Sequence, residues 1–194
     1  MDTKSTGGGL SHCNLDRRSF LKLGMTLACG LLVPFPVRAA INASSSATRS
    51  ISLRNTHTGE SLEKVTYFAE GQYLPEALRE IDVLLRDHRN GEIRTIDPKL
   101  YDQLFELGRA MDHAGPFEII SGYRSPASNS ELRNQSRGVA KRSFHLTGQA
   151  VDIRLPGVQL AQLRRAAIAH RAGGVGFYPS SGFVHIDTGP FRTW

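Results

Sequence analysis

The sequence predicts a single α+β domain, a small antiparallel sheet with flanking helices, and three observations support this class. Short segments of alternating apolar and polar residues recur along the chain, bounded by Gly, Pro or Asn. Between them, apolar residues recur every three or four positions, as on one face of a helix. No internal repeat is visible in the 194 residues. Short strands interleaved with helices therefore indicate one α+β domain.

The first 39 residues have the features of an export leader. A twin arginine, Arg17-Arg18, precedes an apolar stretch at 23–37 that is short and broken by Gly and Pro, unlike a membrane span. Small residues before position 40 suit a signal peptidase. Because RRSFLK resembles the twin-arginine leaders of bacteria, we expect a twin-arginine signal peptide at 1–39. The twin-arginine export machinery would carry the protein to the periplasm, where a retained leader would tether it to the membrane.

The rest of the chain divides into a flexible lead-in at 40–50 and a domain at 51–194. Five basic and two acidic residues in the leader give +3 of the net charge of +6, so the domain is mildly basic and a nucleic-acid partner is not indicated. Both cysteines, Cys13 and Cys29, lie in the leader. Any metal site in the domain must therefore be built from His and carboxylates.

The first half of the domain is predicted from turn and capping signals. Residues 51–68 alternate around Thr58-Gly59, which predicts a β-hairpin. Apolar residues at helical spacing predict a helix over 74–85. Asp97-Pro98 then begins a second helix, with Asp as N-cap and Pro at the first helical position, and Gly115-Pro116 ends it.

The second half follows the same logic. Residues 117–120 are a short strand that runs into SGYRSP, and a polar loop comes next. Residues 149–155 are predicted as a strand and 158–171 as a third helix, which Gly173-Gly174 ends. The segment GVGFYPSSGFVHIDTG closes the domain as a hairpin.

Two polar residues lie within otherwise apolar strand segments, and a third lies in the loop before one of them. Asp152 points away from its apolar strand neighbours, and His185 does the same in the closing hairpin, because side chains alternate along a strand. His145 enters from the loop before the first of these strands, where Gly148 allows a close approach. Two His and one Asp are a sensible zinc set that leaves a fourth position for water. Taken alone, a strand histidine is more often a structural residue with hydrogen bonds inside the fold, so only the three together indicate a metal site.

Longer motifs carry a resemblance. The segments SGYRSP, HLTGQAVD and FVHIDTG resemble the zinc D-alanyl-D-alanine peptidase group, which contains lysostaphin-type enzymes and the hedgehog signalling domain. The match is closest to its YcbK-like branch, the MepK-type murein endopeptidases, and extends over most of the domain. The resemblance implies a hedgehog/D-Ala-D-Ala-peptidase-like fold and one zinc ion bound by His145, Asp152 and His185. It also implies hydrolysis of peptidoglycan peptide cross-links, between two meso-diaminopimelate residues or from D-Ala to meso-diaminopimelate.

The same resemblance assigns the SGYRSP arginine. Related enzymes use this residue, here Arg124, beside the zinc on a substrate carboxylate or on the developing oxyanion, which suits a guanidinium fork. A structural pairing of Arg124 with Glu131 or Asp152 is the alternative. Substrate-binding candidates in the same loop are Ser121, Tyr123 and Asn129.

The general base of better-known relatives is absent by position. Several relatives carry Glu three residues before the last histidine, where this chain has Gly182, and others carry HxH, where it has Phe183. Asp187 is the predicted substitute because it shares a strand face with His185. A role in supporting His185 or the following turn is equally compatible with its position. Tyr178 and His170 are further candidates.

The sequence therefore predicts a monomeric zinc metallopeptidase that acts on peptidoglycan peptide stems. A D-Ala carboxypeptidase of the same group is one alternative. A non-catalytic, zinc-retaining protein that binds the cell wall is another, because the usual Glu is absent. His57 and His88 lie in turns away from the motifs and need no metal.

Overall fold

The computed structural model describes residues 48–135 and 139–194. The predicted signal peptide, both cysteines and most of the predicted lead-in lie outside these ranges. The first strand begins at Arg49, two residues before the predicted start of the domain. Among the described residues, no helix has the length and apolar character needed to cross a membrane.

Eight strands, four α-helices and two short 3₁₀ helices make up the described part of the chain. In chain order they are β1 (Arg49–Asn55), β2 (Ser61–Ala69), β3 (Gln72–Tyr73), α1 (Pro75–Leu84), α2 (Pro98–Ala110), β4 (Phe117–Ser121), α3 (Pro126–Gln135), the 3₁₀ helix Phe144–Thr147, β5 (Ala150–Arg154), α4 (Leu160–His170), β6 (Gly174–Tyr178), the 3₁₀ helix Pro179–Ser181, β7 (Phe183–Asp187) and β8 (Arg192–Thr193).

The strands form one sheet in the order β3-β2-β1-β4-β5-β7-β6-β8. Most neighbours are antiparallel, which confirms the predicted α+β class. Two pairs, β1 with β4 and β6 with β8, are parallel. The order of the strands therefore departs from the order of the chain, and it brings β5 and β7 together near the middle of the sheet, between β4 and β6.

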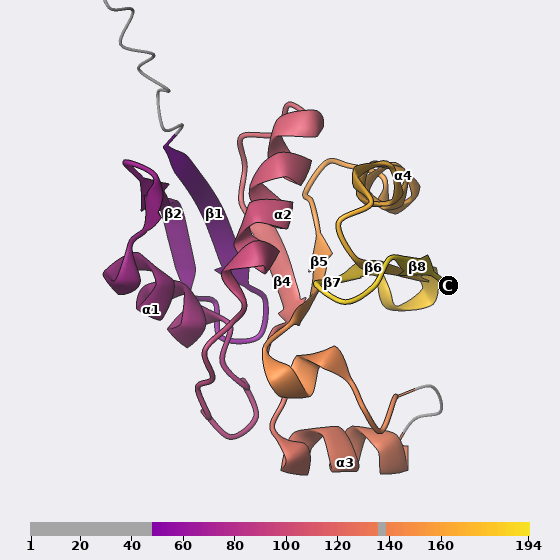
Figure 1. The fold of residues 1–194 in the computed structure, drawn as a ribbon. Helices are drawn as coiled ribbons and strands as arrows, with labels where there is room; N and C mark the ends of the chain where they lie inside the picture. The colour runs from indigo at the N-terminus through magenta and orange to yellow at the C-terminus, as the bar shows by residue number, and fades with distance from the viewer. Residues whose placement is uncertain (1–47, 136–138) are drawn as a thin grey trace, which may run out of the picture. The chain divides into compact units, whose positions relative to one another are not determined.

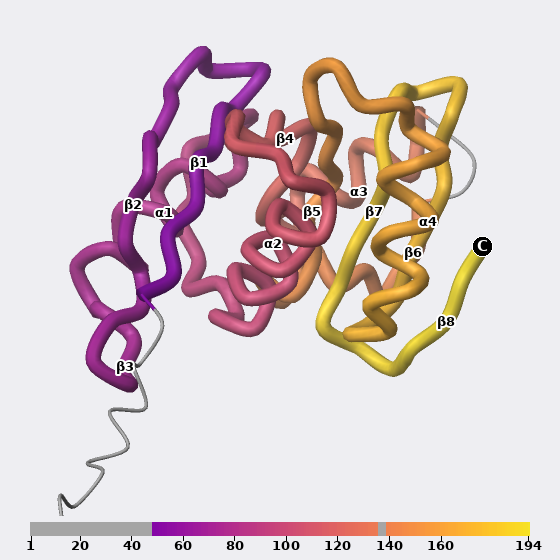
Figure 2. Tube along the Cα trace, turned by 90° about the horizontal axis from the view of Figure 1, so that it is seen from above, coloured from indigo at the N-terminus to yellow at the C-terminus, as the bar shows by residue number. Residues whose placement is uncertain are grey.

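Three helices cover the sheet. Helices α1, α2 and α4 follow one another along it, and α3 lies apart from them beyond the end of β4 (Figures 1 and 2). Helix α2 begins as predicted, because Pro98 is its first residue and the Asp97 carboxylate accepts a hydrogen bond from the Lys99 backbone N–H at 3.1 Å. The predicted β-hairpins at β1–β2 and β6–β7 are also confirmed.

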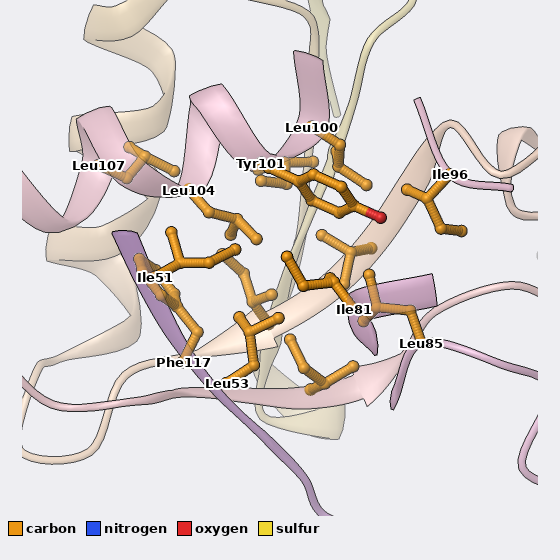
Figure 3. Close-up of a cluster of buried hydrophobic side chains, with 14 of the residues drawn as sticks. Ile51, Leu53, Ile81, Leu85, Ile96, Leu100, Tyr101, Leu104, Leu107 and Phe117 are labelled. Carbon is orange, nitrogen blue, oxygen red and sulfur yellow. The ribbon is translucent and has the colours of Figure 1, made fainter. Parts of the chain in front are cut away.

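The core lies between this helix layer and the sheet. Its fully buried side chains come from the apolar stripes of α1 and α2 and from alternate positions of the strands, and Figure 3 shows a part of this cluster around Leu53, Ile81, Leu100 and Leu104. In β5 the core residues are Val151 and Ile153. Asp152, between them, therefore projects from the other face of the sheet.

One predicted element is wrong. The polar loop expected after SGYRSP is helix α3, whose buried residues are the small polar Ser128 and Asn129 instead of an apolar stripe. Its N-terminus is held by polar contacts: the buried Asp87 carboxylate accepts from the Ser125 N–H at 2.8 Å, and the Ser125 hydroxyl accepts from the Ser128 N–H at 3.2 Å. Hydrophobic periodicity cannot detect such a helix.

Candidate metal centre

The register of the sheet places the predicted site residues in one row. Ser121 of β4 pairs with Asp152 of β5, and Asp152 pairs with His185 of β7. His185 in turn pairs with Gly176 of β6. Because directly paired residues project from the same face, Ser121, Asp152 and His185 lie side by side on the face opposite the core. Asp152 and His185 are 3% and 8% exposed, so both are buried.

His145 reaches this row from the 3₁₀ helix that precedes β5. The Ser143 hydroxyl begins this turn by accepting a hydrogen bond from the His145 N–H at 3.3 Å. Gly148 ends it in the left-handed region at φ 70°, and a Cβ there would stand 2.5 Å from the Thr95 carbonyl oxygen. The close approach expected at Gly148 is therefore present, and His145 is 1% exposed.

One atom from each of the three residues meets at a common point. The His145 Nε2 lies 3.2 Å from the Asp152 Oδ1 and 3.2 Å from the His185 Nδ1. The His185 Nδ1 lies 2.8 Å from the Asp152 Oδ1. The described residues thus contain a possible His-Asp-His metal site made of three buried side chains.

The rear nitrogen of each imidazole is fixed by an acceptor. His145 Nδ1 donates to the Gly122 carbonyl at 2.7 Å, and because a carbonyl only accepts, this nitrogen carries the proton. His185 Nε2 donates to the Asp187 Oδ2 at 3.1 Å. The remaining nitrogens, His145 Nε2 and His185 Nδ1, are the two that face Asp152. Metal-bound histidines have this arrangement, with the second ring nitrogen held by a carbonyl or a carboxylate.

The pKa values of the three converging residues are shifted in different directions. Burial lowers the pKa of His145 below its ordinary value, so this imidazole is neutral at neutral pH. Burial raises the pKa of Asp152, but the two facing imidazoles lower it by more, so the carboxylate is ionised. Burial lowers the pKa of His185, but hydrogen bonds to Asp152 and Asp187 raise it by more. A metal ion would therefore compete with a proton more at His185 than at His145.

Arg124 is tied to the site rather than to Glu131. Its guanidinium donates to the Asp152 Oδ2 at 2.9 Å and to the Ser121 hydroxyl at 3.0 Å, and its backbone N–H donates to the His145 carbonyl at 3.1 Å. The pairing with Asp152, one of the two structural pairings considered from the sequence, is therefore present. It also places the guanidinium directly beside the three converging atoms.

Asp187 lies behind His185. The carboxylate is fully buried and accepts hydrogen bonds from His185, from Arg192 and from the backbone N–H groups of Gly174 and Gly189. Burial raises the pKa of Asp187, but the bonds from His185 and Arg192 lower it to well below its ordinary value. A carboxylate of this kind is a weak base. Of the two roles that the sequence left open, the geometry favours support of His185.

The three predicted substrate-binding residues are all largely buried. The Ser121 hydroxyl accepts from Arg124, so it orients that side chain. Tyr123 is 5% exposed and belongs to the core, with its N–H on the Leu85 carbonyl at 2.7 Å. Asn129 is 4% exposed and donates to the Ala140 carbonyl at 3.3 Å. Contact with substrate stays a prediction for each, and the contacts present are those of a supporting loop.

Sequence reasoning missed several residues around the centre. No sequence pattern signals the Gly122 carbonyl, which lies 23 positions before His145. None signals Arg192 either, which follows Asp187 by five positions and lies in β8, the strand paired with β6. His57 and His88 are closer to the site segment than expected: their rings stack at 3.8 Å, and the His57 Nε2 lies 3.0 Å from the Ile120 carbonyl, one residue before Ser121. The stacking joins two turns that the sequence places 31 positions apart.

Comparison with known proteins gives a consistent result. The family model described as "Peptidoglycan L,D-endopeptidase MepK" matches residues 43–194. The chain is 45% identical over 179 residues to the proteins of that name from Escherichia coli strain K12 and Shigella flexneri, with 92% of this chain and 97% of each relative covered. It is 38% identical over 187 residues to the probable peptidoglycan L,D-endopeptidase MepK of Haemophilus influenzae, with 95% and 98% covered.

Proposed function

This chain belongs to the peptidoglycan L,D-endopeptidase MepK family, and we propose from that premise that it is a zinc-dependent murein endopeptidase. Its substrates would be the peptide cross-links of peptidoglycan. Of the two links considered from the sequence, the one between two meso-diaminopimelate residues joins an L centre to a D centre. That link matches the L,D in the names of the relatives. The link from D-Ala to meso-diaminopimelate joins two D centres and is the less favoured substrate.

The donor set fits a zinc ion. Ligands 2.0–2.1 Å from a tetrahedral zinc stand about 3.3 Å apart, and the three converging atoms are separated by 3.2, 3.2 and 2.8 Å. Two imidazoles and one carboxylate leave a net positive site with a fourth position open, as in catalytic zinc centres. This convergence, with the rear nitrogens of His145 and His185 already engaged, is the observation that carries the proposal.

Each residue of the site then has a chemical role. A zinc ion bound by His145, Asp152 and His185 supplies an activated water and polarises the scissile carbonyl. Arg124, held by the Ser121 hydroxyl, presents its guanidinium to a substrate carboxylate or to the oxyanion that develops during hydrolysis. Asp187 keeps the proton of His185 on Nε2 and the ring in its ligand orientation.

The setting of this activity is part of the proposal. The twin-arginine motif supports export to the periplasm, where peptidoglycan is found, by a route that carries folded proteins. We expect the domain to act there as a monomer, either free or tethered by a retained leader.

Digestion of purified sacculi tests the function. The zinc-loaded protein should release soluble muropeptides in which meso-diaminopimelate cross-links have been opened, as identified by mass spectrometry, and His185→Ala should release none. A matched control is His170→Ala. The sequence left His170 open as a general base, but it is exposed at the end of α4, so this variant should keep parental release. Loss of only a terminal D-Ala from linear stems would show a carboxypeptidase instead. Binding to sacculi without soluble product would show a non-catalytic wall protein.

A further inference from the structure

Arg192 binds the carboxylate of Asp187, the residue that holds the ring of His185. It lies in β8, where Gly174 of β6 is its partner in the parallel pair. Its guanidinium donates to both oxygens of Asp187, from NH1 to Oδ1 at 3.1 Å and from NH2 to Oδ2 at 2.7 Å. This is the bidentate geometry in which arginine holds a carboxylate in a fixed plane. The Asp187 Oδ2 that Arg192 holds is the same oxygen that receives the His185 Nε2–H.

The same guanidinium contacts two aromatic rings beside the centre. Its central carbon lies 5.1 Å from the Phe144 ring and 4.9 Å from the Trp194 ring. Phe144 directly precedes His145 in the chain, and the Trp194 ring lies 5.4 Å from the ring of His185. The Arg192 guanidinium therefore contacts one aromatic ring next to each imidazole: Phe144 beside His145 and Trp194 beside His185. A planar guanidinium can stack on such rings and bind a carboxylate with two hydrogen bonds at the same time.

The absence of a side chain at Gly174 leaves space for the ion pair between Arg192 and Asp187. A Cβ at Gly174 would stand 2.5 Å from NH1 of Arg192 and 2.5 Å from the Asp187 Oδ2. The Gly174 N–H also donates to the Asp187 Oδ1 at 3.1 Å. A side chain at position 174 would thus push the ion pair apart, whereas glycine lets the backbone close over it.

We propose that Arg192 is a positioning residue for the metal ligand His185 and acts through Asp187. The inference rests on the proposed function, since it takes His145, Asp152 and His185 as the ligands of a zinc ion. The bidentate bond fixes the plane of Asp187, and Asp187 in turn fixes the rotation of the His185 ring. The site is therefore preorganised by the last strand of the domain, which supplies none of the three ligands.

The test is the zinc affinity of three variants of the full chain, measured by competition with a chromophoric chelator at fixed pH. Arg192→Gln removes the charge and the fork. Arg192→Lys keeps the charge but loses the fork and the planar stacking. Arg49→Gln is the matched control, because Arg49 also combines a carboxylate partner, Asp102 at 2.7 Å, with a ring, Phe68 at 4.3 Å, at the other half of the sheet.

Removing a group that orients a metal ligand typically weakens metal binding 10- to 100-fold. We expect a loss of that size in Arg192→Gln, a smaller loss in Arg192→Lys, and no change in Arg49→Gln. At saturating zinc the KM for sacculi should stay at its parental value in both Arg192 variants, because Arg192 acts on the ligand and not on the substrate.

The outcomes separate this inference from the function on which it rests. Parental zinc affinity in folded Arg192→Gln overturns the inference, and if that variant does not fold, parental affinity in Arg192→Lys overturns it. A loss of affinity that is equal in Arg49→Gln overturns it too, because the effect is then general destabilisation. A parent protein that binds no zinc overturns the proposed function, and the inference with it.

Discussion

Gly122→Ala tests whether the close approach of two backbone segments sets the position of His145, a proposed metal ligand. A Cβ at residue 122 would stand 2.3 Å from the Leu85 carbonyl oxygen and 3.0 Å from the Leu85 Cα. These are backbone atoms and cannot rotate away, so either the SGYRSP segment or the end of α1 must move. The Gly122 carbonyl, which accepts the proton of His145 Nδ1, moves with it.

The expected cost comes from two contributions. Overpacking of this kind costs about 1–3 kcal/mol, and separation of the segments breaks the hydrogen bond from the Tyr123 N–H to the Leu85 carbonyl, worth about 1 kcal/mol. A total of roughly 2–4 kcal/mol corresponds to a fall in melting temperature of about 6–12 °C for a domain of this size. Displacement of the carbonyl behind His145 should also weaken zinc binding about 10- to 100-fold.

The control is a second Gly→Ala substitution, at Gly108, for which the expected change in melting temperature has the opposite sign. Gly108 lies inside α2, and a Cβ there would meet the Phe117 ring at 3.5 Å, an ordinary contact. Gly108→Ala should therefore raise the melting temperature by about 2–4 °C, since alanine in a helix interior is favoured over glycine by ~1 kcal/mol. Thermal melts by circular dichroism and zinc competition measure both effects. A Gly122→Ala protein with parental melting temperature and zinc affinity would refute the reasoning.

Three further predictions concern metal and pH. Zinc removal by a chelator should lower the melting temperature of the parent but not of Asp152→Ala, since zinc at 1,000 times its Kd stabilises by about 4 kcal/mol; equal shifts would argue against the site. Burial raises the pKa of Asp82 despite the hydrogen bond from Tyr101. The protonated carboxyl therefore stabilises the fold fully below the pKa of Asp82 in the unfolded chain, and this contribution is lost as the pH rises through its pKa in the folded protein. In urea unfolding, the free energy of unfolding of Asp82→Asn should rise relative to that of the parent between pH 4 and pH 7. A difference between the two proteins that stays constant over this range would refute the prediction. Burial and nearby Arg89 lower the pKa of His88 to about 4, so stability should fall as pH drops from about 6.5 towards 4, and less so in His88→Gln.

The sequence predicts the elements of this fold wherever one local signal is sufficient. The Asp97-Pro98 cap and the apolar stripe of α2 are such signals, as is the alternation that turns Asp152 away from the core. Helix α3 was mispredicted because it is held by Asp87 and two serines rather than by an apolar face. The parallel pairing of β8 with β6 could not be predicted, because β8 is an edge strand of only two residues and is too short to show an alternating pattern.

The candidate site divides in the same way. The convergence of His145, Asp152 and His185 can be predicted because residue types that suit a metal and strand alternation are properties of short segments. The groups that orient them cannot. The Gly122 carbonyl is a backbone atom common to every residue, and Arg192 is one arginine among many until register places it behind Asp187.

The position of the centre within the sheet has a physical consequence for how it works. Asp152 and His185 are paired on β5 and β7, each of which has a strand on either side, so their backbones are fixed by ladders on both edges. Only His145 comes from a turn, and that turn is held through Gly122 and Arg124 to the end of β4. Two ligands are thus as rigid as the sheet itself, and rigid donors lose little entropy when they bind an ion. A change in metal affinity is therefore most readily made at the Gly122 carbonyl behind His145 and at the Asp187 carboxylate behind His185, because these single contacts, and not strand pairing, set the orientation of the two imidazole rings.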